Sequence, residues 1–246
     1  MDHITGHLYL MGITLWYSPL PNSNFNTQFN YLVSAINTLV FNNEMNIVYN
    51  EFNASGLKGK ESSFNDYGFD ILPCHMTLMK NIPDDEKIFN KLMRLILAVL
   101  HTDSKEMVDD RNKYSRIRLD KNNNISFNSN IFFKNCVLEV DKTSISVLLS
   151  MIKIINEHIP EIPLVDIETL QPHISLCYSN NKITENKELQ NSIKRRLKMY
   201  LDFQNNELDW GIGMGSLYNN KKIGRFYLVR CEGPVDTWKV LRALDI

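Results

Sequence analysis

The apolar positions of the chain repeat with two different periods, and each period predicts one kind of element. Spacings of three and four residues, typical of an amphipathic helix, run over residues 25–41. The same spacing predicts helices from Pro83 to residue 100, from 143 to 158 and over 184–200. Acidic residues occupy the first turns of the second and fourth helices, and Asp141 is placed to cap the third.

Short runs of mostly apolar residues, bounded by turn-forming residues, predict the strands. They lie at residues 7–16, 69–80, 114–119, 131–140, 172–178, 208–218 and 224–231. The polar stretch 50–67 contains several Gly, Ser and Asn residues and predicts a mobile loop. The tail 234–246 predicts a short helix.

Charge and length narrow the classes of function. The chain has 246 residues, with 27 Lys and Arg against 28 Asp and Glu, a formal net charge of −1. This balance argues against a protein that coats long nucleic acids, because such proteins need a basic excess to neutralise phosphates. It is compatible with an enzyme that holds only the end of a strand.

Neither the ends of the chain nor its cysteines indicate export, membrane insertion or a metal site. No window approaches 18 consecutive apolar residues, and the first residues lack the basic and apolar regions of a secretory signal. The four cysteines are scattered, without a CxxC pair or ligand pairs at zinc spacing. We therefore expect a soluble intracellular protein with reduced thiols and no metal.

Two predicted strands carry the same motif: a histidine, an apolar residue, a hydroxyl residue and a leucine. His75 and Thr77 belong to the first motif, and His173 and Ser175 to the second. Because alternate residues of a strand share a face, each strand presents an imidazole and a hydroxyl together, opposite its apolar side chains. One such motif is weak evidence, since isolated histidines are mostly core or surface residues. Two motifs among six histidines form a much more specific pattern.

Both motif strands also occur in the same local setting. The first leads through a turn into a helix that starts near Asp84, and the second into a helix that starts near Thr184. This repetition predicts a duplicated architecture with two lobes.

Paired histidines suit the cleavage of a phosphodiester. A neutral imidazole can remove a proton from a ribose 2′-OH, which attacks the adjacent phosphorus, and a protonated one can supply a proton to the leaving 5′-oxygen. The hydroxyls of Thr77 and Ser175 can donate hydrogen bonds to the non-bridging oxygens as charge develops there. This chemistry needs no metal.

With these motifs the chain resembles the 2H phosphoesterase superfamily, and within it the 3′–5′ exoribonucleases that trim the tail of U6 small nuclear RNA. The similarity rests on the two motifs, on the passage 128–157, and on residues 219–229, which resemble the basic last hairpin of that family. It extends from about residue 7 to residue 231.

The resemblance implies an α+β fold of two pseudo-symmetric lobes, each an antiparallel sheet with outer helices, around a central cleft. The whole chain, 1–246, would then be one two-lobed domain with its N- and C-terminal strands in the same lobe. It also implies a nuclear monomer without cofactor, whose partner is an RNA 3′ end such as that of U6, with a mitochondrial pool left open. The RNA would lose nucleotides from an oligouridine or oligoadenosine end and keep a 2′,3′-cyclic phosphate or its hydrolysed monophosphate.

The resemblance makes His75 and His173 the catalytic pair, and Thr77 and Ser175 the phosphate contacts. The sequence does not fix which histidine is the base, and we take His75 as base and His173 as acid in the first step. Further substrate contacts are expected from basic and aromatic side chains near the motifs. They are Lys80, Lys221 and Lys222 for phosphates, and Tyr178, with Tyr218 and Trp210 as alternatives, for stacking on bases.

The positions two residues after each hydroxyl, Met79 and Cys177, are predicted to lie on the same face as the histidines. For Met79 we favour a packing role. For Cys177 we do not favour a nucleophilic role, because no third orienting residue is recognisable.

Other functions remain open for the same site. The motif pair alone does not separate RNA trimming from a 2′,5′-oligoadenylate phosphodiesterase, a cyclic nucleotide phosphodiesterase or an RNA ligase-like protein. A scaffold of this fold that binds nucleotides without turnover is the non-enzymatic alternative.

Overall fold

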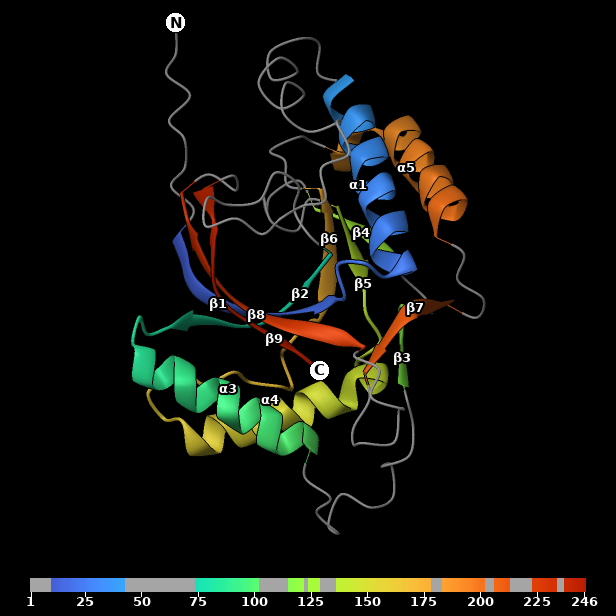
Figure 1. The fold of residues 1–246 in the computed structure, drawn as a ribbon. Helices are drawn as coiled ribbons and strands as arrows, with labels where there is room; N and C mark the ends of the chain where they lie inside the picture. Colours follow the sequence, from blue (N-terminus) through green and yellow to red (C-terminus); the bar gives the residue numbers. More distant parts are fainter. Residues whose placement is uncertain are drawn as a thin grey trace, which may run out of the picture.

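The structure is a computed structural model that describes residues 10–42, 74–101, 115–121, 124–128, 136–177, 183–201, 206–212, 223–233 and 237–246 (Figure 1). Its α-helices are α1 (Asn24–Asn42), α3 (Glu86–His101), α4 (Ser146–His158) and α5 (Lys187–Tyr200), and short 3-10 helices span Lys142–Ile145 and Ile183–Glu185. Its strands are β1 (Leu10–Pro19), β2 (Met76–Ile82), β3 (Ser115–Arg118), β4 (Ile125–Phe127), β5 (Cys136–Glu139), β6 (His173–Cys177), β7 (Glu207–Ile212), β8 (Gly224–Glu232) and β9 (Lys239–Asp245). Among the described residues, no helix is long and apolar enough to cross a membrane.

Seven strands form one antiparallel sheet in the order β4-β5-β6-β2-β1-β8-β9, and β3 pairs with β7 in a separate two-stranded sheet. The mixture of helices and antiparallel sheet confirms the α+β class. The two motif strands, β2 and β6, are neighbours in the larger sheet, so both motifs belong to one continuous sheet rather than to two separate ones. The division into two lobes around a cleft remains a prediction.

The helices pack against one face of this sheet. Leu15, Met76, Ile174 and Phe226, from four different strands, belong to a single apolar cluster. Buried residues of every helix join the same cluster, including Phe29, Leu32, Phe89, Leu92, Leu148, Ile152, Ile193 and Leu197. Helix α3 lies beside α4, and α1 beside α5, along two parts of the bent sheet (Figure 1). One core therefore supports both halves of the sheet.

Most elements agree with the hydrophobic pattern. The predicted helices at 25–41 and from Pro83 to 100 are confirmed as α1 and α3. Asp141 caps as expected, but the turn it caps is a 3-10 helix that precedes α4. The last predicted helix begins three residues later than expected, because Asn186 is its N-cap and accepts a hydrogen bond from Leu189 N.

The prediction of a helix in the tail is wrong, since β9 is an edge strand paired with β8 from Arg225 to Arg230. Its pairing satisfies backbone groups along an edge of β8 that would otherwise stay open. Trp238, just before β9, is fully buried. Strand β4 was not predicted, and the predicted loop at 50–67 lies outside the described residues.

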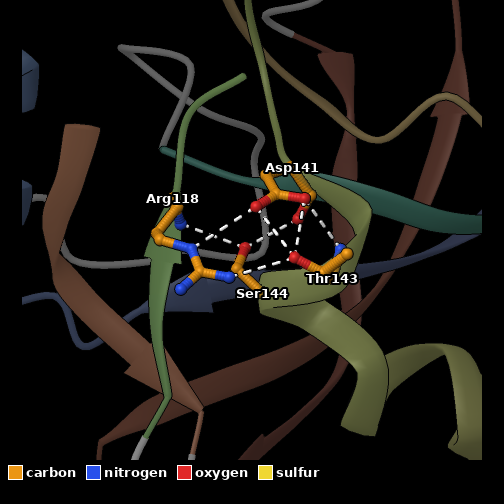
Figure 2. Close-up of polar contacts among 4 residues, drawn as sticks. All are labelled: Arg118, Asp141, Thr143 and Ser144. Carbon is orange, nitrogen blue, oxygen red and sulfur yellow. Dashed lines mark hydrogen bonds and ion pairs between the residues drawn. The ribbon is translucent and has the colours of Figure 1, made fainter. Parts of the chain in front are cut away.

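A polar network joins β3 to the start of the 3-10 helix before α4 (Figure 2). Arg118 forms an ion pair with Asp141 at 3.4 Å, and its guanidinium donates to the Thr143 hydroxyl at 3.0 Å. The backbone N–H of Arg118 donates to the Ser144 hydroxyl, which itself donates to the Asp141 carbonyl. Asp141 also accepts from the backbone N–H of Thr143 at 2.9 Å. Burial opposes ionisation of Asp141, but the Thr143 hydrogen bonds and Arg118 outweigh it and lower the pKa of the carboxyl.

Replacing Asp141 should therefore change how stability depends on acid pH. A carboxyl whose pKa is lower in the folded state stabilises fully above its ordinary pKa, and this contribution is lost as the pH falls through the folded-state pKa. The wild-type protein should lose more free energy of unfolding than Asp141→Asn between about pH 4 and pH 2, in urea titrations at each pH. At neutral pH, Asp141→Ala should cost about 1 kcal/mol as a lost N-cap, and Asp141→Asn, which still caps, less. Parallel acid profiles of wild type and Asp141→Asn would contradict this account.

Candidate functional site

The register between β2 and β6 places both motifs on the same face of the sheet. Met76 is the partner of Ile174 in this antiparallel pair, and both side chains are fully buried in the helix-side core. The residues that flank a paired position turn to the opposite face. We call this opposite face, defined by His75, Thr77, His173 and Ser175, the motif face.

The same register relates the two motifs by a local two-fold arrangement. In an antiparallel pair with Met76 opposite Ile174, position 75 faces 175 and position 77 faces 173. Each histidine therefore has the hydroxyl residue of the other motif directly across from it. The two histidines are diagonal neighbours, for which Cβ separations of about 7 Å are typical, within reach of long side chains. The strands thus bring together the four predicted residues.

Neighbouring strands extend this arrangement on both sides. In β1, Trp16 is the partner of Thr77, and in β5, Glu139 is the partner of His173. The Glu139 carboxylate also accepts a hydrogen bond from the Ser126 hydroxyl of β4. An indole and a carboxylate therefore flank the motif pair on the same face.

The two histidines have different surroundings. His75 is 3% exposed, and its ring stacks on Trp16 with centroids 3.7 Å apart and an angle of 16° between the planes. His173 is half-buried, and its Nδ1 lies 2.9 Å from the Gln171 carbonyl oxygen. Donation from Nδ1 to this carbonyl leaves Nε2 as the nitrogen that can exchange a proton with a substrate.

Both motif strands are irregular immediately after the hydroxyl residue. The register shifts between Thr77 and Met79 in the pairing with β1, and between Ser175 and Cys177 in the pairing with β5. Met79 and Cys177 consequently lie in the helix-side core, each 2% exposed. The prediction that they share a face with the histidines is wrong, because a bulge inserts a residue and changes the alternation. For Met79, the favoured packing role is confirmed.

The remaining predicted contacts are distributed differently. Lys80 lies on β2 with an exposed side chain, between the core residue Met79 and the exposed Asn81. Trp210 is 2% exposed and stacks on Tyr17 and Phe25 in the core, so it is not available for stacking on a base. Tyr178, Tyr218, Lys221 and Lys222 lie outside the described residues.

The chemistry available on the motif face is acid–base catalysis and hydrogen bonding. Thr77 is half-buried and Ser175 is 6% exposed, and each hydroxyl can donate a hydrogen bond. In the described part of the chain, no group of three or more His, Cys, Asp or Glu residues is arranged to hold a metal ion. The four cysteines are buried and form no disulfide, and burial raises the pKa of the thiols of Cys74, Cys136 and Cys231.

Sequence reasoning missed three residues of the motif face, namely Trp16, Ser18 and Glu139. Ser18 continues the β1–β2 register to a place across from His75, and its hydroxyl is buried without a hydrogen-bond partner among the residues that the structure describes. Alternation within β1 and β5 indicates which of their residues share a face. Nothing in the sequence indicates that these two strands lie beside the motif strands.

Removing the Ser18 hydroxyl should stabilise the protein. A buried polar group without a partner costs about 1–3 kcal/mol, so Ser18→Ala should raise the free energy of unfolding by about 1 kcal/mol in urea titrations. Thr14→Val is a matched control on the same strand, because that hydroxyl donates to the Val229 carbonyl at 3.3 Å. The control should lower stability by a similar amount. Destabilisation by Ser18→Ala would show that the hydroxyl has a partner in the folded protein.

Comparisons with known proteins agree with this geometry. A family model described as "Cyclic phosphodiesterase-like protein" matches residues 11–246. Over 74 residues the chain is 40% identical to a "2',3'-cyclic-nucleotide 3'-phosphodiesterase" of Yarrowia lipolytica (strain CLIB 122 / E 150), a match that covers 30% of this chain and 30% of that protein. These similarities support the superfamily that the paired motifs indicated, and not the U6-processing branch. The chain belongs to the cyclic phosphodiesterase-like family of the 2H phosphoesterase superfamily.

Proposed function

We propose that this protein is a phosphodiesterase that hydrolyses 2′,3′-cyclic nucleotides at the ester of the 3′-oxygen, using His75 and His173 as its acid–base pair. The observation that carries the proposal is the pairing of Met76 with Ile174, because this register places both motifs on one face as diagonal neighbours. The family and the Yarrowia relative support the substrate class.

The reaction needs two proton transfers on opposite sides of one phosphorus. One imidazole takes a proton from water as the water oxygen forms its bond to phosphorus. The other gives a proton to the ribose 3′-oxygen as the bond from that oxygen to phosphorus breaks. The product is a nucleoside 2′-monophosphate, and proton exchange with solvent restores the starting protonation states.

The hydroxyls of Thr77 and Ser175 have a separate role in this proposal. Negative charge grows on the non-bridging oxygens as the attacking oxygen adds to phosphorus. Fixed hydroxyl donors stabilise this charge more in the transition state than in the bound substrate. Each hydroxyl lies across from the histidine of the other motif, so both donors and both imidazoles can surround one phosphate.

Trimming of an RNA 3′ end, as by the U6 exoribonucleases, is the second candidate. It is favoured by the motif pair itself, because attack by a neighbouring 2′-OH needs the same base and acid as attack by water. The two candidates differ in the nucleophile and in what must bind beyond the phosphate. They are therefore separated by substrates rather than by the histidines.

Loss of either histidine should abolish most of the activity. We expect His75→Ala and His173→Ala each to lower kcat/KM for a 2′,3′-cyclic nucleotide by about 10²–10⁴-fold, the usual contribution of a general acid or base. The assay follows the conversion of the cyclic phosphate to the 2′-monophosphate by ³¹P NMR, with EDTA present. His158→Ala is the matched control, since this exposed histidine ends α4 and contacts the Ile154 carbonyl, and it should keep full activity. Full activity of the His75→Ala, His173→Ala double variant would refute the proposal.

A substrate panel distinguishes the candidates. A cyclic nucleotide phosphodiesterase should hydrolyse 2′,3′-cyclic AMP and 2′,3′-cyclic UMP while leaving an RNA with a terminal oligouridine and free 3′-OH at its full length. Mass spectrometry of the RNA end provides the measurement, and an RNA whose penultimate nucleotide is 2′-deoxy is the control for transesterification, because it lacks the hydroxyl that attacks the last phosphate. Stepwise shortening of the unmodified RNA, with the control left intact, would favour trimming instead.

A further inference from the structure

The plane of a histidine ring has to be fixed before its nitrogen can exchange a proton in a chosen direction. The torsion that turns an imidazole about its Cβ–Cγ bond is broad, so the rotamer alone does not set this plane. Contacts with neighbouring groups must set it. In the structure the two catalytic candidates use different contacts for this purpose.

For His173 one such contact is the 2.9 Å approach of Nδ1 to the Gln171 carbonyl, which orients the ring through a polar atom. For His75 a face-to-face contact with the indole of Trp16 acts on the whole ring. Centroids 3.7 Å apart and nearly parallel planes leave the imidazole no freedom to rotate out of this plane without a clash with the indole. The nitrogens of His75 therefore act within a plane that Trp16 determines.

Trp16 is itself held firmly enough to serve as a reference surface. It is fully buried, and its backbone pairs with Thr77 on one side and with Tyr227 on the other. Trp238 packs against the indole at a centroid distance of 6.0 Å and an angle of 59°, and the Trp238 Nε1–H donates to the Gly233 carbonyl. The tail of the chain thereby supports the indole that supports His75.

We propose that Trp16 is the positioning residue of His75, through the stack of its indole on the imidazole. Trp16 takes no part in proton transfer. It keeps the reactive nitrogen of His75 aimed along the motif face toward the phosphate. The catalytic consequence rests on the proposed function, because it assumes that His75 exchanges a proton with the substrate.

The test compares Trp16→Leu, which removes the aromatic surface, with Trp16→Phe, which keeps one. Misplacement of a catalytic group by about 1 Å can cost about 10²-fold, so Trp16→Leu should lower kcat for 2′,3′-cyclic AMP by about 10²-fold. KM should stay within about twofold, since the phosphate contacts are unchanged. Trp16→Phe should recover most of kcat, as stacking without the full indole still limits rotation.

An NMR measurement detects the stacking of Trp16 on His75 independently of catalytic activity. The His75 ring protons, assigned by their absence in His75→Ala, should show ring-current shifts in the wild type that disappear in Trp16→Leu. The His173 ring protons should move little. Trp210→Leu is the matched control, because it removes a buried tryptophan from the helix-side core, and it should leave both kcat and the His75 signals near wild type.

Three outcomes decide the matter. A folded Trp16→Leu variant overturns the proposal if its kcat equals that of the wild type, or if its His75 ring-proton signals stay at their wild-type positions. If Trp16→Leu does not fold, the His75 ring-proton signals of Trp16→Phe decide: they should move because a phenyl ring replaces the indole, and signals identical to the wild type overturn the proposal. If the wild type hydrolyses no cyclic nucleotide while the His75 signals still depend on Trp16, the proposed function fails and the orienting role of Trp16 stands.

Discussion

The pairing of Met76 with Ile174 is the constraint on which the candidate site depends. A slip of one residue of β2 against β6 would turn His75 into the helix-side core and bring Met76 to the motif face. A slip of two residues would keep the face but replace the diagonal arrangement, with the histidines either directly across from each other or four positions apart along the strands. The register is held because both paired residues are fully buried among side chains of the helices. The hydrophobic core therefore fixes the geometry of polar residues that lie on its opposite side.

The two motifs are alike in sequence and in strand geometry, but the residues that surround their histidines differ. Both strands bulge just after the hydroxyl residue, so each motif is short and its last residue returns to the core. The surroundings of the two histidines differ. His75 stacks on the indole of Trp16, whereas His173 has Glu139 as its strand partner and contacts a backbone carbonyl through Nδ1. Acid–base catalysis needs one neutral and one protonated imidazole at the same pH. A symmetric pair in identical surroundings would be less suited to that division of roles.

The sequence predicted what local pattern can encode. Helical spacing located α1 and α3, and strand alternation placed His75 with Thr77 and His173 with Ser175 opposite apolar side chains. Alternation failed at Met79 and Cys177, because a bulge depends on how the neighbouring strand pairs. The tail was mistaken for a helix for the same reason, since an edge strand is stabilised by β8 rather than by its own pattern. The contact between Trp16 and His75 joins residues distant in sequence, and no local signal indicates it.

The charges on the motif face favour a small substrate over a long one. Arg225 extends the row that contains Ser18, and it forms an ion pair with Asp245 and donates to the Tyr227 hydroxyl. Its cationic charge is therefore already balanced, and burial, as the largest cause, raises the pKa of Tyr227 to about 12, which keeps that hydroxyl neutral. A phosphate at the motifs would be met by their imidazoles and hydroxyls, and Lys80 is the single exposed cation on β2 rather than part of a row. Such a surface suits one phosphodiester, as in a cyclic nucleotide, whereas a polynucleotide backbone would require several unpaired cations along its path.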